Sequence, residues 1–272
     1  MRDLVEAALV QSANDAAWAL AVHVGKGDVG AFVRMMNAKA RRLGLTGTRF
    51  VRPDGLDVTG HVSTARDVTQ LARVAMRNPS IREMVDDRTS TIAGGRRLHT
   101  WNDLLATLPV VIGVKTGHTA AAGWSQVAAA RGSGFILYAT LLGSPTRSQR
   151  NADLGALVRW GLSRYARAGV VSAGRVYARA RVGYGRASVG LVAPKSISRS
   201  VRVDRPLRER VVAATAVELP VRKGQRFGEV LVFDGDRLLA RSPLVAARSV
   251  ARPGFADRVG WYATRAVENL WP

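Results

Sequence analysis

The chain has 272 residues, of which 41 are Lys or Arg and 20 are Asp or Glu, and it contains no cysteine. Its apolar share of 47% and charged share of 22% are ordinary for a globular protein, which excludes extended disorder, and its length allows one large domain or two smaller ones. The lack of cysteine excludes disulfides, zinc–thiolate sites, iron–sulfur clusters and thiol nucleophiles.

A net charge of +21 is typical of nucleic-acid-binding proteins. The distribution of the basic residues along the chain, however, argues against a nucleic-acid-binding face. The arginines are scattered, with no run longer than the pairs Arg41-Arg42 and Arg96-Arg97, and they are densest between Arg175 and Arg210. Uniform use of Arg in place of Lys more often reflects coding bias than a binding face. We therefore predict no nucleic-acid partner, although a surface this basic favours anionic lipid headgroups or wall polymers.

The first third of the chain predicts helices. No stretch reaches the ~18 to 20 apolar residues of a membrane span, and the start lacks the residue order of a signal peptide. It resembles instead the inside of an amphipathic helix, from Asp3 to Val24, interrupted by the polar run Ser12 to Asp15. The same reasoning predicts a helix over Val29–Leu43 capped by Gly44, a loop over Thr46–Gly60, and a helix from Ser63 to a stop at Asn78-Pro79 with Thr64 and Asp67 at its start.

Strand character follows. Val110 to Thr116 is an apolar run that ends in a polar turn, and Ser125–Ala130 and Phe135–Leu142 form a hairpin through Arg131–Gly134. A further helix is predicted over Asn151–Tyr165. The expected fold of residues 1–168 is α+β, with helices packed on an antiparallel sheet.

From Gly169 onward the sequence pattern changes: short stretches in which apolar and polar residues alternate are separated by Gly, Pro, Asp and Ser. This pattern predicts a small all-β domain over residues 169–250. The expected strands are Val176–Val182, Ala187–Leu191, Ser200–Val203, Val211–Val217 and Gly228–Phe233.

The tail, residues 251–272, predicts an amphipathic helix. At 100° per residue, Phe255, Val259, Tyr262, Ala263, Ala266, Val267 and Leu270 share one side, and only Trp261 breaks the division. Two interpretations stay open. The helix lies on an anionic membrane surface, with Trp261 and Trp271 at the headgroups, or it packs on the β domain.

Two short motifs carry the chemistry. Ser12-Ala13-Asn14 interrupts the first helix, and Lys115-Thr116-Gly117 is placed at the end of an apolar strand, 103 residues further on. Each motif alone is weak. Together with an upstream Ser-x-x-Lys, the pair is the signature of penicillin-binding proteins and class A β-lactamases. The histidines lack the order of a metallopeptidase, His61 and His99 are interpreted as structural, and no metal or other cofactor is implied.

In these motifs and in the residues around them, the chain resembles the D-alanyl-D-alanine carboxypeptidases, low-molecular-mass penicillin-binding proteins of the serine peptidase type. The match is close over residues 1 to about 165 and looser in the β domain, where it is best at Pro220–Gly228 and Pro243–Ala246. The fold implied for the first domain is β-lactamase/transpeptidase-like. The matching stretches are Ser12–Ala17, Met36–Ala40, Leu43–Leu45, Thr48–Phe50, Pro53–Leu56, His61–Asp67, Asn102–Leu105, Gly113–Thr119 and Ala122–Gly123.

The resemblance implies that a serine attacks the bond between two D-alanines of a peptidoglycan stem peptide, and that water then hydrolyses the acyl-enzyme. It also implies the site residues. Ser12 relays a proton to the leaving amine. Asn14 offers its amide to the substrate backbone or to the lysine partner of the nucleophile, and Lys115 places a positive charge near the terminal carboxylate and Ser12. Thr116 hydrogen-bonds that carboxylate, Gly117 admits the substrate backbone, and the His118 N–H is an oxyanion donor. β-Lactam antibiotics are implied ligands, and the implied location is extracytoplasmic.

The chain departs from this pattern at the nucleophile. The residues three before its lysines are His23, Met36, Ile112, Val192 and Pro220, so no Ser-x-x-Lys is present. Because the chain starts almost at the Ser12 motif, we expect the nucleophile, its lysine, the first sheet strands and a signal peptide to be missing, and the chain as given to be inactive. Three hypotheses remain: a fragment of a carboxypeptidase, a non-catalytic protein that binds peptidoglycan or a partner, and, on charge alone, a nucleic-acid binder.

Overall fold

The computed structural model describes residues 1–184 and 188–270, with side chains in the last helix as far as Ala263. The chain divides into two compact units, Met1–Ser163 and Arg164–Pro272, each with its own core. The predicted boundary near Gly169 falls inside the first strand of the second unit, β6 (Tyr165–Val171).

The first unit begins with helices, as predicted. The interrupted first helix is present as α1 (Arg2–Glu6), a π-helical turn η1 (Ala7–Gln11) and α2 (Asn14–Val24), with the break at Ser12 and Ala13. α4 begins one residue after Thr64, whose hydroxyl accepts a hydrogen bond from the Asp67 N–H, as the predicted capping pattern requires. The remaining helices are α3 (Val29–Arg42), α4 (Ala65–Ala75), α5 (Pro79–Asp86), α6 (Leu104–Thr107) and α7 (Arg147–Ser163).

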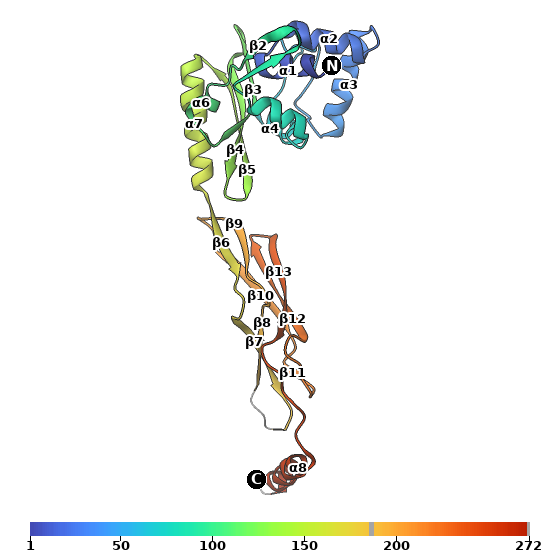
Figure 1. The fold of residues 1–272 in the computed structure, drawn as a ribbon, viewed down its shortest axis with the longest axis vertical. Helices are drawn as coiled ribbons and strands as arrows, with labels where there is room; N and C mark the ends of the chain where they lie inside the picture. The colour runs from blue at the N-terminus through green and yellow to red at the C-terminus, as the bar shows by residue number, and fades with distance from the viewer. Residues whose placement is uncertain (185–187, 271–272) are drawn as a thin grey trace. The chain divides into compact units, whose positions relative to one another are not determined.

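An antiparallel sheet in the order β3-β4-β5 forms the centre of this unit, and helices cover both of its faces (Figure 1). Because side chains alternate along a strand, Val127 and Ala129 point to α4 and α5, whereas Ala128 and Ala130 point to α6 and α7. A short hairpin precedes this sheet. The strands are β1 (Thr89–Ile92), β2 (Arg96–His99), β3 (Val111–Thr119), β4 (Gly123–Gly132) and β5 (Phe135–Ser144), with the 3-10 turn η2 (Ala93–Gly95) between the first two.

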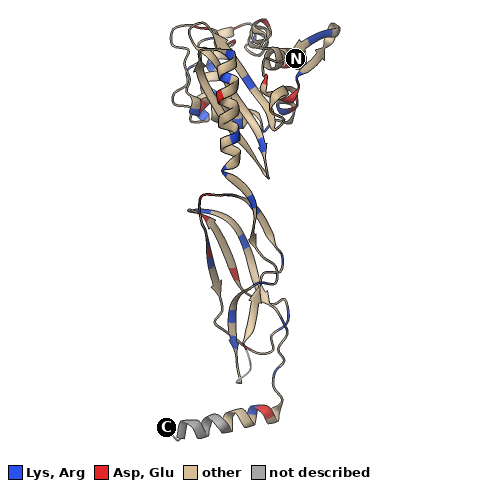
Figure 2. Cartoon of the chain, turned by 90° about the vertical axis from the view of Figure 1, so that its left-hand side faces the viewer, with Lys and Arg blue, Asp and Glu red and all other residues tan. Residues whose placement is uncertain are grey.

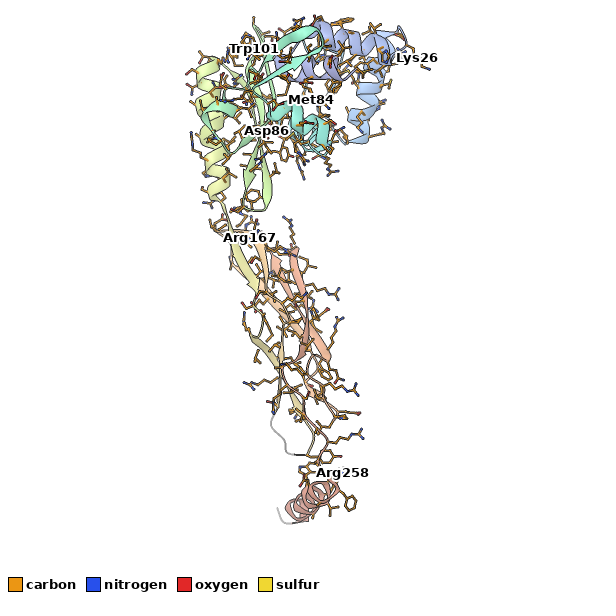
Figure 3. The ribbon with its side chains drawn as sticks, in the orientation of Figure 1. Lys26, Met84, Asp86, Trp101, Arg167 and Arg258 are labelled. Atoms are coloured by element: carbon orange, nitrogen blue, oxygen red, sulfur yellow. The ribbon has the colours of Figure 1, made fainter. Side chains whose placement is uncertain are left out.

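The structure adds to this unit a helix and a hairpin that were not predicted, and it corrects the end of β3. Asn78-Pro79 ends α4 but also begins α5, because Asn78 accepts hydrogen bonds from Ser80 and Ile81 and Pro79 fits the first helical turn. Met84 of α5 (Figure 3) packs with Val10 and Leu98 and joins the N-terminal helices to the core. The hairpin of β1 and β2 was not predicted.

The correction concerns β3. The strand does not end at Thr116 but continues to Thr119, so Lys115, Thr116 and Gly117 lie within it.

The second unit is the predicted small all-β domain, built around the buried residues Val189, Leu191, Val230 and Leu244. Its largest sheet has the order β10-β12-β13-β8-β7-β11, and β6 pairs with β9. The predicted strand Val211–Val217 is in fact the end of β10 and all of β11, and β6 and β13 were missed. Ala187 lies outside the described residues. The strands are β6, β7 (Val176–Val182), β8 (Val189–Val192), β9 (Ile197–Arg202), β10 (Leu207–Ala213), β11 (Ala216–Val217), β12 (Arg226–Asp234) and β13 (Arg237–Ala246).

The tail forms the helix α8 (Phe255–Leu270), as predicted. Its described apolar residues are exposed: Phe255 by 77%, Val259 by 51% and Tyr262 by 60%. Trp261, which breaks the predicted division, makes an edge contact with Tyr184 of the β domain at 5.4 Å between ring centres. The predicted face members beyond Ala263, and Trp271, lie outside the described side chains.

Basic residues are spread over both units (Figure 2). The second unit carries 21 Lys and Arg against 8 Asp and Glu, so its share of the excess charge is the larger one. None of the helices among the described residues combines the length and the apolar character of a membrane-spanning segment.

Candidate active site

The two sequence motifs meet in one cleft of the first unit, with a volume of about 720 Å³. Ser12 occupies the left-handed region, with φ 61° and ψ 37°, because the π-helical turn ends at Gln11 and α2 starts only at Asn14. The indole of Trp101 donates a hydrogen bond to the Gln11 carbonyl at 3.1 Å. The helix break therefore presents the Ser12 hydroxyl to the cleft.

Lys115 faces Ser12 from strand β3. Its Nζ donates to the Ser12 Oγ at 2.6 Å and to the Thr116 carbonyl at 2.8 Å. Burial lowers the pKa of Lys115 to about 8, since the ammonium loses water and no carboxylate of the described residues pairs with it. The hydrogen bond between Lys115 and Ser12 joins positions 103 residues apart in the sequence and creates a polar, partly desolvated centre.

The rest of β3 forms one wall of the cleft. In the part of the chain that the structure describes, β3 pairs only with β4, so its other edge is free of a strand partner. Thr116, Gly117 and His118 follow one another along this wall, and the His118 ring stacks on Trp124 at 4.0 Å. Such an edge can accept an extended peptide through main-chain hydrogen bonds.

A loop and α2 form the opposite wall. Asn14 is exposed on this wall, and the loop places Pro53 to Leu56 beside it. The Asp54 carboxylate accepts hydrogen bonds from the Trp18 indole at 2.8 Å and from Arg52 at 2.5 Å. Burial alone would raise the pKa of Asp54, but these donors outweigh burial and hold it at about 2. The loop is therefore fixed to α2.

A buried arginine, which sequence reasoning missed, completes the cleft. Arg150 of α7 lines it, is fully buried, and lies over the Trp124 ring at 5.7 Å. Its guanidinium donates to Asn151 at 2.7 Å, and Asp103 lies 3.5 Å away. Asp103 is also held by Arg147, whose guanidinium and the adjacent Asn151 amide lower the pKa of that carboxyl.

All six predicted site residues, Ser12, Asn14, Lys115, Thr116, Gly117 and His118, thus line the same cleft. Within the described part of the chain, no cluster of His, Asp and Glu has the arrangement to hold a metal ion. His61 accepts a hydrogen bond from the Val51 N–H at 3.2 Å and lies outside this group.

The fold and the cleft define a class: a β-lactamase/transpeptidase-like α+β domain followed by a small all-β module. The sequence model of the D-alanyl-D-alanine carboxypeptidase family matches residues 1–146, and that of the penicillin-binding protein 5 C-terminal domain matches residues 165–252. The chain belongs to the D-alanyl-D-alanine carboxypeptidase family.

Individual relatives agree with this assignment. The chain is 29% identical to the D-alanyl-D-alanine carboxypeptidase DacD of Salmonella typhimurium, over 96% of the chain and 68% of the relative. Penicillin binding protein 5 of Haemophilus influenzae superposes with a TM-score of 0.61 at 29% identity, over 92% of this chain and 74% of that one. Penicillin-Binding Protein D2 of Listeria monocytogenes, solved in its cefotaxime-bound form, has a TM-score of 0.54 at 34% identity, over 58% and 65%.

Proposed function

We propose that the cleft belongs to a serine-type D-Ala-D-Ala carboxypeptidase, which removes the terminal D-alanine of peptidoglycan stem peptides through an acyl-enzyme. The observation that carries the proposal is the 2.6 Å bond between Lys115 and Ser12, because it unites the two motifs on the wall of a peptide-sized cleft. The family of the chain and the names of its relatives support the same substrate class. β-Lactams are proposed ligands, as a relative has been solved with cefotaxime bound.

The proposed roles follow from the chemistry of each group. Lys115, with its lowered pKa, exchanges a proton with Ser12, and Ser12 passes it to the leaving amine. Thr116 hydrogen-bonds the terminal carboxylate, and Gly117 leaves room for the substrate backbone because no atom lies within 4 Å of the position its Cβ would take. The main-chain N–H of His118 is an oxyanion donor.

Two further groups complete the substrate contacts. Asn14, exposed on the opposite wall, offers its amide to the substrate backbone. The cation of Arg150, which also lines the cleft, adds to the attraction of the same carboxylate, although Asp103 compensates part of its charge.

The attacking serine of the mechanism has no candidate within these 272 residues, since no Ser-x-x-Lys occurs in them. We therefore propose that this chain by itself forms no acyl-enzyme. The same observation favours a second candidate function, a non-catalytic protein that binds peptidoglycan or a partner in the cleft.

Intact-mass measurement after incubation with labelled penicillin tests the first part of this proposal, and the expected result is no adduct. A stoichiometric adduct on Ser12 would show that Ser12 is the nucleophile and would contradict its relay role. NMR titration with an acyl-D-Ala-D-Ala peptide tests the cleft itself. We expect shifts of the Thr116 to His118 amides, and their absence would count against both candidate functions.

We also propose that the protein works outside the cytoplasm at the cell wall, with α8 on an anionic membrane surface. The exposed apolar residues Phe255, Val259 and Tyr262 support this location, because their burial in an interface removes apolar area from water. The competing arrangement, packing on the β domain, rests on the contacts of Trp261 and Tyr262 with Tyr184.

A further inference from the structure

One face of the β domain, remote in sequence from the cleft, gathers arginines around an apolar strip. Val230 and Val232 of β12 are buried in the core, so the alternate residues Glu229, Leu231 and Phe233 lie on the outer face of the sheet. This outer face of β10, β12 and β13 is called the arginine face below.

The strand register arranges its side chains in rows. Arg210 of β10 pairs with Leu231, and Leu231 pairs with Arg241 of β13. Two strand spacings separate the two arginines, about 10 Å. In the next row Phe233 lies between Arg208 and Leu238, and Leu238 is 49% exposed. The apolar side chains thus have an arginine on both sides in the first row and on one side in the second.

The carboxylates on the arginine face do not compensate all of its positive charge. Glu229 is shared by Arg226 and Arg241, at 3.1 and 2.7 Å, so one carboxylate faces two guanidinium groups. Arg208 pairs with Asp236 at 3.1 Å. Arg210 has no ion pair or hydrogen bond with any residue that the structure describes.

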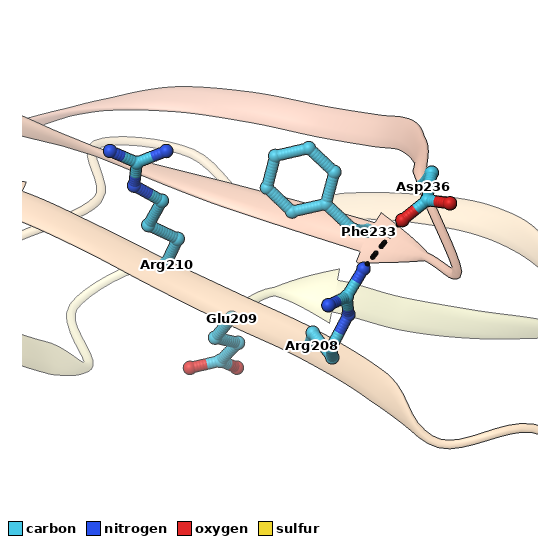
Figure 4. Close-up of a pocket in the computed structure, with 5 residues that line it drawn as sticks. All are labelled: Arg208, Glu209, Arg210, Phe233 and Asp236. Atoms are coloured by element: carbon cyan, nitrogen blue, oxygen red, sulfur yellow. Dashed lines mark hydrogen bonds and ion pairs between the residues drawn. The ribbon is translucent and has the colours of Figure 1, made fainter.

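A hollow of about 350 Å³ lies between these groups, lined by Arg208, Glu209, Arg210, Phe233 and Asp236. Figure 4 shows Arg210 and Phe233 projecting on the same side of the strands, with Glu209 on the other side. Glu209 is bound there by both terminal nitrogens of Arg175, at 2.9 and 3.1 Å, which compensates its charge. The hollow therefore presents a free guanidinium beside an aromatic ring.

We propose that the arginine face binds an acidic polysaccharide. A sugar ring packs on Phe233 through its apolar C–H face, while the acidic group of the sugar takes the two parallel hydrogen bonds that the Arg210 guanidinium offers. Arg241, in the same row as Arg210 and two strand spacings from it, contacts an acid further along the polymer. The site goes beyond the carboxypeptidase cleft and uses none of its residues.

The experiment uses the full chain and polygalacturonate as the probe, with binding measured by affinity electrophoresis at low and moderate salt. Dextran supplies sugar rings without charge, and polyphosphate supplies charge without rings. The substitution Arg210→Gln should weaken polygalacturonate binding about tenfold, the size of one charge-assisted hydrogen-bonded contact. Phe233→Leu should weaken it about fivefold through lost ring packing.

Lys223→Gln is the matched control, because it removes the same charge at an exposed turn beyond the other end of β12. It should change binding less than twofold, and thermal unfolding should show all variants folded. Equal losses in Arg210→Gln and Lys223→Gln would overturn the proposal in favour of diffuse attraction. Binding of polyphosphate or DNA as tight as that of polygalacturonate, and insensitive to Phe233→Leu, would also overturn it.

Discussion

Lys115 lies in a buried environment that disfavours its charged form. Burial lowers its pKa from 10.5 to about 8. Each pKa unit corresponds to about 1.4 kcal/mol, so the protonated form costs the folded state roughly 3 kcal/mol below pH 8. Between pH 8 and 10.5 the unfolded chain binds more protons than the folded one, and stability therefore rises with pH in this window.

The rise of stability with pH between 8 and 10.5 leads to a first prediction. Lys115→Met removes the penalty but also the bond to Ser12, so its stability relative to the parent chain should fall steadily as the pH rises from 8 to 10.5. Urea unfolding at intervals across this range measures the difference. Lys39→Met, at an exposed position of α3, controls for the loss of one lysine. A difference that stays constant across the window would mean that Lys115 is not desolvated.

A second prediction concerns chemistry at the same residue. In a longer form that carries a Ser-x-x-Lys nucleophile, Lys115→Ala should lose at least ~10²-fold in acylation, since an oriented charge in a desolvated site contributes several kcal/mol. Labelling by a fluorescent penicillin is the assay. Lys115→Arg should also be poor, because a planar guanidinium cannot replace a compact ammonium against Ser12. Near-normal labelling of both variants would remove Lys115 from the mechanism.

Among single residues, the sequence predicted those site residues that stand in motifs. It missed the residue that tertiary packing alone brings to the cleft. Ser12 and Lys115 stand in short patterns with a chemical meaning, and the structure brings them within 2.6 Å. Arg150 has no such pattern in a chain rich in scattered arginines. Its place in the cleft depends on α7 packing behind Trp124, a contact that no local spacing encodes.

At the scale of elements, α4 depends on its first turn. Thr64 caps the helix at the Asp67 N–H, while the buried Asp67 carboxylate holds the preceding loop through Gly47 and Thr48. Thr64→Ala should cost about 1 kcal/mol of unfolding free energy, the usual value of a lost N-cap, as measured by urea denaturation. Thr64→Ser keeps the hydroxyl and should restore most of it. Equal stabilities of the two variants would show that the cap contributes nothing.

The predicted ends of elements were most accurate where a local sequence signal marks that end. Gly44 and the Thr64 capping pattern fixed the end of α3 and the start of α4. β13 was missed because Pro243 interrupts its alternation, and only pairing with β12 and β8 holds it as a strand. β3 extends past the predicted end at Thr116 because its polar half pairs with β4 up to Gly123, which is a tertiary and not a local reason.

The whole molecule carries its excess charge unevenly, and the tail lies at the end of the more basic unit. If α8 is interfacial, a peptide of residues 254–272 should become helical on anionic vesicles through burial of its apolar side, because its two Arg are balanced by Asp257 and Glu268 and add no net charge. Sedimentation with such vesicles, compared with neutral vesicles as the control, is the measurement. A peptide that stays in the supernatant at low salt would favour packing on the β domain.

The aromatic residues around the cleft have one more consequence. Trp101 and Trp124 both line it, and the Trp124 indole is stacked on the His118 ring. An occupant of the cleft therefore changes the surroundings of both indoles at once. The wavelength and intensity of the intrinsic tryptophan fluorescence therefore report binding in the cleft without any added dye.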